Sequence, residues 1–508
     1  MCGIFLQIES SNGPNERQVK LISNRGPDSL KEFTCNLGSK KLSGVSSVLH
    51  LRGDSTIVQP LESSRFILQW NGEIFDYNNE ESETLLKQND TEFLFDRIHS
   101  DKEDIKTVLS SIKGPWAVTI IDKENDAVYF GRDYFGRRSL LYSSDVDGGF
   151  IITSVAENST KSKWIEATSG ILYKLDLKSM ELSQEPLDVL KYSISDVDCD
   201  LAFANTEAES NFVQEGLDQL RKSVRKRIIH SHSKKIGILF SGGIDSLLIT
   251  AVTADLIKKE KLELEIDLIN VAFEQAGLMK SLKLSEVNSD YYESVPDRIG
   301  GRVAFSELKK LYPNVLMNFV ALNINRIQYE TEKDRVIELL QPNRTVMDLS
   351  LGIVLWFGSR GSSSHETNKF KILLLGMGAD EQLGGYSRHL SAFHTDSWKG
   401  LLSEMQMDLD RLGHRNLGRD DRCISDNGRE ARFPFLDEDF VEWICKLPLR
   451  IKCDLTLPKG QGDKRIFRLM GLSLGFSEDV AFRPKKAMQF GAKSAKISSS
   501  DCKGDDIL

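Results

Sequence analysis

The chain has 508 residues, more than one hydrophobic core usually serves, so its length predicts two domains. Hydrophobic residues make up 40% and charged residues 28% of the sequence, which excludes a chain that is disordered throughout. The net charge of -9 argues against a nucleic-acid partner, because binding to phosphates requires clustered Lys and Arg side chains.

The seven cysteines are spread along the chain with no CxxC pair and no histidine at zinc-finger spacing, so no disulfide framework or structural zinc site is predicted. The start, MCGIFLQIES, lacks a basic leader and is unlike a secretory signal. No apolar stretch approaches the roughly 20 residues of a membrane helix. We therefore expect a soluble, cytoplasmic protein with no membrane partner. Its oligomeric state stays open, and a homodimer is one option.

The first part of the chain, residues 1–190, alternates short extended runs with Gly, Asp and Asn turns. Examples of the runs are GIFLQI, RFILQWNGEIF and WAVTIID, and helical stretches interrupt them near residues 15–23 and 91–100. Many extended runs with few helices are typical of antiparallel sheets packed face to face. This pattern predicts an α+β domain of layered antiparallel sheets.

The second part, residues 210–508, follows a polar, acidic stretch that is typical of a linker. An amphipathic helix is followed by the strand KIGILF, the turn SGGIDS, the helix LLITAVTADLIKK and the strand LEIDLINVAF. This succession predicts an α/β domain with a doubly wound parallel sheet. The basic stretch at 221–235 is interpreted as a solvated helix face, and the tail from Ser494 is expected to be loose.

Cys2 is notable for its position, because removal of Met1 would make it the amino terminus. A terminal cysteine has a free amine beside its thiol. That amine, with a pKa of about 8, can accept the thiol proton and so activate the nucleophile. The alternative is a small apolar residue at the start of a strand.

Two later motifs add polar groups of the types that such a nucleophile needs. RGPD, at 25–28, is a rigid turn whose ends could bracket a small zwitterion. In NGEIF, at 71–75, Asn71 and Gly72 could donate hydrogen bonds to an oxyanion while Glu73 receives an ammonium group. Taken alone, each motif is also compatible with an ordinary turn or hairpin.

Over roughly the first 180 residues, the chain resembles the class II glutamine amidotransferases. The resemblance is carried by five segments taken together, namely MCGI, RGPD, the segment around Arg52, NGEIF, and NDTE at 89–92. The resemblance implies an Ntn-hydrolase-like glutaminase domain with Cys2 as nucleophile and Asn71 and Gly72 as the oxyanion hole. It also implies that Arg52 binds the glutamine carboxylate, and that Glu73 and Asp90 bind the glutamine amine.

SGGIDS, at 241–246, lies between a predicted buried strand and a helix. Its glycines, Gly242 and Gly243, let the backbone wrap a phosphate, and Ser241 and Ser246 can donate hydrogen bonds to it. Asp245 is placed to hold Mg²⁺. The loop resembles the pyrophosphate loop of enzymes that split ATP into AMP and pyrophosphate; the alternative is a plain strand-to-helix turn.

Three further segments complete the second set of motifs. GMGADEQLGGY, at 376–386, offers Asp380 as a second magnesium ligand, and EARFPFLD, at 430–437, follows it. RPKKAMQFG, at 483–491, places lysines where a point charge could stabilise departing pyrophosphate. By themselves the last two segments would pass for surface loops.

With SGGIDS, these segments resemble the asparagine synthetase family across nearly the whole chain. The resemblance implies an ATP-pyrophosphatase domain that uses ATP, Mg²⁺, glutamine and a carboxylate acceptor, aspartate by default. It assigns Leu239, Val271 and Gly376 to the adenosine and Lys485 to the charge of the transition state. In this scheme, ammonia passes through a channel to an adenylated carboxylate.

The sequence departs from the family where the acceptor should bind. Met377 replaces an acidic residue that is thought to guide ammonia, and MDLS, at 347–350, replaces a Thr-Thr-x-Arg stretch that grips aspartate. Ser350 therefore removes a carboxylate clamp, and Asp348 is expected to add negative charge near an acidic substrate. Leu247 replaces a second serine of the phosphate loop. Two alternatives to asparagine synthesis follow, namely the same chemistry on another acceptor, or a synthetase-inactive adaptor.

Overall fold

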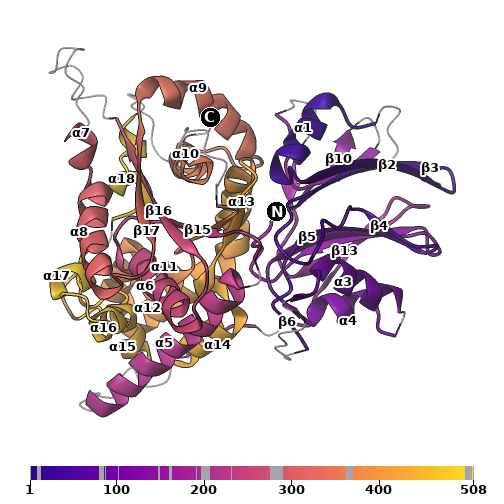
Figure 1. The fold of residues 1–508 in the computed structure, drawn as a ribbon. Coiled ribbons are helices and arrows are strands. Elements are labelled where there is room, and N and C mark those ends of the chain that lie inside the picture. Colours follow the sequence, from indigo (N-terminus) through magenta and orange to yellow (C-terminus); the bar gives the residue numbers. More distant parts are fainter. Residues whose placement is uncertain are drawn as a thin grey trace.

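The computed structural model describes residues 2–8, 13–78, 85, 87–100, 102–146, 149–158, 163–189, 191–195, 206–229, 231–274, 290–361, 370–484, 486–497 and 506. It shows two parts that lie side by side (Figure 1). The first contains the antiparallel strands, and the second contains a parallel sheet surrounded by helices. Both fold classes predicted from the sequence are confirmed. Among the described residues, no helix is long and apolar enough to cross a membrane.

The first domain contains two stacked six-stranded antiparallel sheets. One has the order β12 (Ile165–Glu166), β10 (Leu141–Val146), β11 (Gly149–Thr153), β1 (Gly3–Ile8), β3 (Lys40–Val48) and β2 (Ser29–Leu37). The other has the order β14 (Leu182–Pro186), β13 (Ile171–Asp176), β9 (Ala127–Arg132), β8 (Trp116–Asp122), β5 (Phe66–Gly72) and β4 (Leu61–Glu62). A small ribbon of β6 (Asp76–Tyr77) and β7 (Ile112–Lys113) adjoins them.

The core of this domain forms because apolar side chains alternate along the strands. Residues such as Leu6, Ile121 and Phe130 fill the space between the two sheets. Helix α1 (Glu16–Arg25) contacts β3, while α3 (Asp90–His99) and α4 (Ile105–Ser110) cover the other sheet (Figure 1). The sequence reasoning missed β2, whose side chains are mostly half-buried or exposed and therefore lack a clear apolar face.

The second domain contains a five-stranded parallel sheet with the order β17 (Met317–Ile324), β16 (Glu265–Phe273), β15 (Lys235–Leu239), β18 (Ile372–Leu374) and β19 (Glu430–Arg432). The chain winds outward from β15 in one direction and then, from β18, in the other. Such a reversal opens a crevice at the carboxyl ends of the central strands, where ligands bind. The predicted doubly wound sheet is therefore confirmed.

The helices of this domain are α5 (Thr206–Ile228), α6 (Ile244–Glu260), α7 (Asp290–Glu293), α8 (Pro296–Leu311), α9 (Arg326–Leu339), α10 (Val346–Arg360), α11 (Ala379–Gln382), α12 (Ser387–Arg415), α13 (Leu417–Ser425), α14 (Glu438–Lys446), α15 (Leu449–Lys452), α16 (Arg465–Ser473), α17 (Glu478–Ala481) and α18 (Met488–Gly491). Two short 3-10 turns are η1 (Pro434–Leu436) and η2 (Ser494–Lys496). Helix α6, which follows β15, is buried over most of its surface, so it belongs to the core.

Two expectations for this domain were wrong. The segment from Ser494 is not loose as far as it is described, because the Ser494 hydroxyl donates a hydrogen bond of 2.6 Å to the Ser350 carbonyl and Ile497 is buried. The rest of the tail, apart from residue 506, lies outside the described residues. In the basic stretch, Arg227 is buried rather than solvated, because Asp437 compensates its charge at 2.8 Å.

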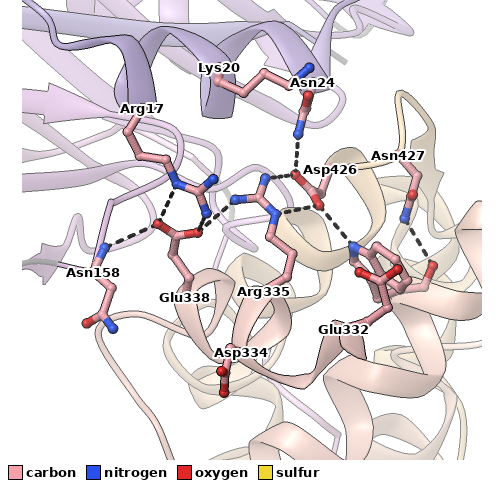
Figure 2. A pocket seen from close by; sticks show the side chains of 11 residues that line it. Arg17, Lys20, Asn24, Asn158, Glu332, Asp334, Arg335, Glu338, Asp426 and Asn427 are labelled. Carbon is pink, nitrogen blue, oxygen red and sulfur yellow. Dashed lines mark hydrogen bonds and ion pairs between the residues drawn. The ribbon is translucent and has the colours of Figure 1, made fainter. Parts of the chain in front are cut away.

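A network of ion pairs joins the two domains beside an open groove of about 710 Å³ (Figure 2). Arg17 of α1 donates from Nε to Glu338 of α9 at 3.1 Å, and Arg335 donates from Nε to Asp426 at 3.0 Å. Asn24 of α1 donates to the same Asp426 carboxylate at 3.0 Å. These contacts connect α1 of the first domain to α9 and the end of α13 in the second.

Candidate active sites

Cys2 lies immediately before β1 in a cavity that also contains Arg52, Gly72, Glu73 and Asp90. Its backbone N–H donates a hydrogen bond of 2.9 Å to Oδ1 of Asn71. The structure therefore brings together the six glutaminase residues predicted from the sequence, although they come from segments up to 88 positions apart.

Asn71 is fully buried near the end of β5. Its Nδ2 atom has no hydrogen-bond partner among the described residues. A buried amide donor normally has a partner, so this group is available to a charge that develops beside Cys2. At Gly72, a Cβ atom would lie 2.6 Å from the Trp70 ring and 2.8 Å from the Pro115 carbonyl oxygen, so glycine is required there.

The charged groups of this cavity have little contact with water. Arg52 lies 3.7 Å from both Glu73 and Asp90, and its two terminal nitrogens donate to the Ile74 carbonyl at 3.1 Å. Burial raises the pKa of the Glu73 carboxyl and that of Asp90. Burial also raises the pKa of the Cys2 thiol to about 11. Such a thiol needs a nearby base to become a nucleophile, which is the role predicted for the terminal amine.

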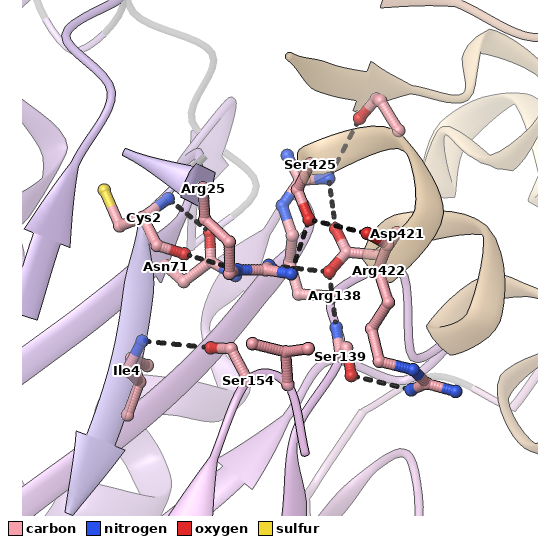
Figure 3. Close-up of polar contacts among 12 residues, drawn as sticks. Cys2, Ile4, Arg25, Asn71, Arg138, Ser139, Ser154, Asp421, Arg422 and Ser425 are labelled. Carbon is pink, nitrogen blue, oxygen red and sulfur yellow. Dashed lines mark hydrogen bonds and ion pairs between the residues drawn. The ribbon is translucent and has the colours of Figure 1, made fainter. Parts of the chain in front are cut away.

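The RGPD turn does not have its predicted role of bracketing a zwitterion. Arg25 donates from Nε to the Cys2 carbonyl at 3.2 Å and from a terminal nitrogen to Asp421 of α13 at 2.7 Å (Figure 3). At the other end of the turn, Asp28 accepts a hydrogen bond of 2.8 Å from Lys371. Both ends therefore bind the second domain, because the Arg25 guanidinium is buried and needs a carboxylate partner.

Two residues that line this cavity, and a third that contacts Glu73, have no signal in the sequence. Gln59 directs Nε2 toward Cys2 Sγ at 3.7 Å, and its Oε1 accepts from the Trp70 backbone at 2.7 Å. Glu430 lines the cavity, and Arg432 lies 3.0 Å from Glu73. Both belong to EARFPFLD, which carries no local signal of contact with the first domain.

A second cavity, of about 730 Å³, opens at the carboxyl ends of β15, β16 and β18. The predicted ATP-binding residues that line it are Leu239, Ser241, Gly243, Asp245, Ser246, Val271 and Gly376. Gly242 has a φ of +73°, and a Cβ there would lie 2.4 Å from the Gly300 carbonyl oxygen, so glycine is required. Gly243 caps α6 with no side-chain hydrogen bond, which leaves N–H groups of the first turn to bind a phosphate.

The two predicted magnesium ligands converge on one cationic group. The Lys464 ammonium lies 2.5 Å from Asp245 and 2.7 Å from Asp380, and its side chain is 1% exposed. Burial would lower the pKa of Lys464, but the two carboxylates raise it above its ordinary value. Asp245 and Asp380 therefore fit a shared cation. The described residues contain no cluster of three His, Cys, Asp or Glu side chains that could hold a metal by themselves.

Lys464 has no signal in the sequence, and the family resemblance assigns the transition-state charge to Lys485 instead. Lys485 lies outside the described residues. Its neighbours Arg483 and Lys486 line the same cavity.

The acceptor end of this cavity is the part near Met347, Asp348 and Met377, where the carboxylate acceptor is expected to bind. It differs from the expectation in two ways. Met347, Asp348 and Met377 line the cavity, but Ser350 does not; its hydroxyl donates to the Met347 carbonyl of its own helix at 2.8 Å. Asp348 does not add uncompensated negative charge, because Arg419 lies 2.6 Å from it. The same guanidinium contacts Asp420 at 2.8 Å, so Arg419 is already held by two carboxylates.

Comparison with known proteins agrees with this division into two sites. Residues 1–174 match the family model for the glutamine amidotransferase domain, and residues 394–500 match the model for asparagine synthase. The chain is 32% identical to asparagine synthetase domain-containing protein 1 of Bos taurus, over 100% of this chain and 97% of that relative. The chain belongs to the asparagine synthetase domain-containing protein family.

Two further relatives show how broad the similarity is. Asparagine synthetase domain-containing protein 1 of Gallus gallus is 34% identical over 94% of each chain. Human asparagine synthetase [glutamine-hydrolyzing] is 23% identical, over 98% of this chain and 86% of that relative. The general type of this chain is therefore a glutamine amidotransferase domain joined to an asparagine synthase domain.

Proposed function

We propose that this protein hydrolyses glutamine at Cys2 and uses the ammonia to amidate a carboxylate that ATP activates in the second cavity. The observation that carries this proposal is the pairing of Cys2 with Asn71, whose buried Nδ2 has no partner among the described residues. Such an unfilled donor beside a nucleophile suits the oxyanion of acyl transfer.

In the first step of this mechanism, the Cys2 sulfur attacks the glutamine carboxamide and its proton passes to the terminal amine. Asn71 and the Gly72 backbone receive the oxyanion. Glu73 and Asp90 hold the substrate amine, and Arg52 holds its carboxylate. On collapse of the tetrahedral intermediate, the protonated terminal amine gives its proton to the leaving nitrogen, so that ammonia departs and a thioester remains on Cys2. Water then hydrolyses this thioester, which releases glutamate and restores the Cys2 thiol.

In the second cavity, the SGGIDS loop and the amino end of α6 would bind the phosphates of ATP, and the Leu239 and Val271 region would receive the adenosine. Asp245 and Asp380 would hold magnesium, which neutralises phosphate charge when bound. Ammonia in neutral water is mostly protonated and then is no nucleophile, so a route through the interface between the domains would keep it reactive.

For the acceptor, we propose a carboxylate that is held differently from aspartate. Met377 offers no proton acceptor at the acceptor end of the cavity. Arg419 is engaged by Asp348 and Asp420, so it would have to break existing ion pairs before it could clamp a substrate carboxylate. This supports the same amide-forming chemistry on another acceptor.

The experiment that tests the whole proposal is a screen for conversion of ATP to AMP with glutamine present and a panel of carboxylates. We expect AMP to form only when an acceptor from the panel is added, with glutamate as a co-product. Absence of both glutamate release and AMP formation across the panel would contradict the proposed enzyme.

A separate prediction concerns magnesium and ATP. Asp245→Asn and Asp380→Asn should each weaken ATP binding in the presence of magnesium by at least about tenfold, which corresponds to about 1.4 kcal/mol. The reason is that the triphosphate would face a site with fewer cation ligands. Isothermal titration calorimetry measures the effect. Asp255→Asn on the same helix is the matched control, because that carboxylate pairs with Arg221 instead. Unchanged ATP affinity in both cavity variants would refute the magnesium assignment.

A further inference from the structure

The second domain places two charged side chains at the glutaminase cavity, one in its lining and one against Glu73. Glu430 and Arg432 stand at alternate positions of β19, the edge strand of the parallel sheet. Side chains two residues apart on a strand point to the same face. Glu430 lines the cavity beside Cys2, and Arg432 lies 3.0 Å from Oε1 of Glu73.

Arg432 is held firmly in this position. Its Nε donates to Glu430 at 2.6 Å, and a terminal nitrogen donates to the Arg227 carbonyl at 2.5 Å. Glu430 lies 3.3 Å from Arg138 of the first domain. The exposed fractions of Glu73, Glu430 and Arg432 are 4%, 2% and 3%, so these charges depend on each other rather than on water.

Glu73 needs a positive neighbour to stay charged. Burial raises the pKa of Glu73, and Arg432 opposes this rise more strongly than Arg52 does. The other charged groups that face Glu73 are Glu430 and Asp90, and both raise its pKa. An ionised carboxylate is required to bind the ammonium group of an amino acid.

The position of Arg432 is also tied to the second cavity. The Arg432 carbonyl accepts a hydrogen bond of 3.0 Å from the Leu375 N–H. Leu375 directly precedes Gly376, which lines the proposed nucleotide site. The arginine is therefore fixed to the sheet of one domain while its side chain acts in the other.

We propose that Arg432 is a positioning residue for glutamine, supplied by the synthetase domain, which fixes the Glu73 carboxylate for the amine of the substrate. This inference rests on the proposed glutaminase activity at Cys2. It assigns part of the glutamine affinity of the first domain to a strand of the second.

The test compares Arg432→Gln and Arg432→Lys with the parent in steady-state hydrolysis of two substrates. One is glutamine, and the other is glutaramate, which has the carboxamide and the carboxylate but lacks the amine. In Arg432→Gln we expect the KM for glutamine to rise about tenfold or more, a loss of about 1.4 kcal/mol, with kcat changed far less. The preference for glutamine over glutaramate, as a ratio of kcat/KM values, should shrink by the same factor. The ratio of Arg432→Lys should lie between that of the parent and that of Arg432→Gln.

Two further readouts separate this role from a merely structural one. Glu73→Gln should lose the same preference, and the double variant should lose little more, because both changes remove one interaction. The acid limb of kcat/KM for glutamine should move to higher pH in Arg432→Gln, because loss of the guanidinium raises the pKa of Glu73 further. Arg429→Gln is the matched control, since Arg429 lies just before β19 and packs over the Phe370 ring.

The outcomes are distinct. Equal losses for both substrates, or an unchanged KM for glutamine in a folded Arg432→Gln variant, would overturn the inference. Thermal unfolding followed by circular dichroism shows whether that variant folds. If Arg432→Gln does not fold, the test uses the preference of Arg432→Lys for glutamine over glutaramate. A preference equal to that of the parent would then overturn the inference. Failure of the parent itself to hydrolyse glutamine would instead refute the proposed function.

Discussion

Replacement of Cys2 by alanine is expected to reduce glutamine hydrolysis by at least about a thousandfold, because no acyl-enzyme can form without the thiol. Amidation driven by added ammonia should persist in the same variant, since the second cavity and its carboxylates are unchanged. The two activities are measured as glutamate release from glutamine and as acceptor-dependent AMP formation with ammonium salts.

Cys35→Ala is the control for this experiment, because Cys35 is a partly exposed cysteine on β2, outside the Cys2 cavity. Mass spectrometry of the active protein should show Cys2 as the first residue. The buried thiol, with its pKa raised to about 11, needs the adjacent free amine as its base. Undiminished hydrolysis in Cys2→Ala, or an active protein that retains Met1, would contradict the assigned nucleophile.

With aspartate, ATP and glutamine, this protein is expected to form asparagine at least about a thousandfold more slowly than a family member that keeps the acid at position 377 and the α10 clamp. Two losses contribute. Met377 cannot accept a proton from ammonia, and Ser350 of α10 supplies no guanidinium to clamp the acceptor. Arg419 does not replace this clamp, because two carboxylates already bind it. Each loss costs about 2 to 4 kcal/mol, by analogy with the removal of one preorganised charge partner.

The measurement is asparagine formation by chromatography, with the reference synthetase assayed in parallel. Met377→Glu should not restore the reaction by itself, because the acceptor would still lack its clamp. Glutamine hydrolysis, which takes place in the other cavity, serves as the internal control for a folded enzyme. Formation of asparagine by the parent at the rate of the reference enzyme would contradict our interpretation of the acceptor end.

Much of the architecture could be predicted from local signals. Alternating apolar residues predicted the antiparallel sheets, and the succession of strand, SGGIDS, helix and strand predicted the doubly wound sheet around β15. The glutaminase residues could also be grouped, because the order of their motifs resembles one family. These signals are short in range, or depend only on motif order, so no tertiary contact had to be known.

Contacts between distant segments were decided by the tertiary structure alone. Arg25 reaches Asp421 across 396 positions, and Lys464 reaches Asp245 across 219. Arg432 reaches Glu73 because β19 ends the parallel sheet at the domain interface. A buried charge needs an opposite charge beside it, but the sequence does not say which one. The pairing depends on how the sheets and helices pack, and that packing turned Ser350 away from the acceptor cavity and directed Arg432 into the glutaminase site.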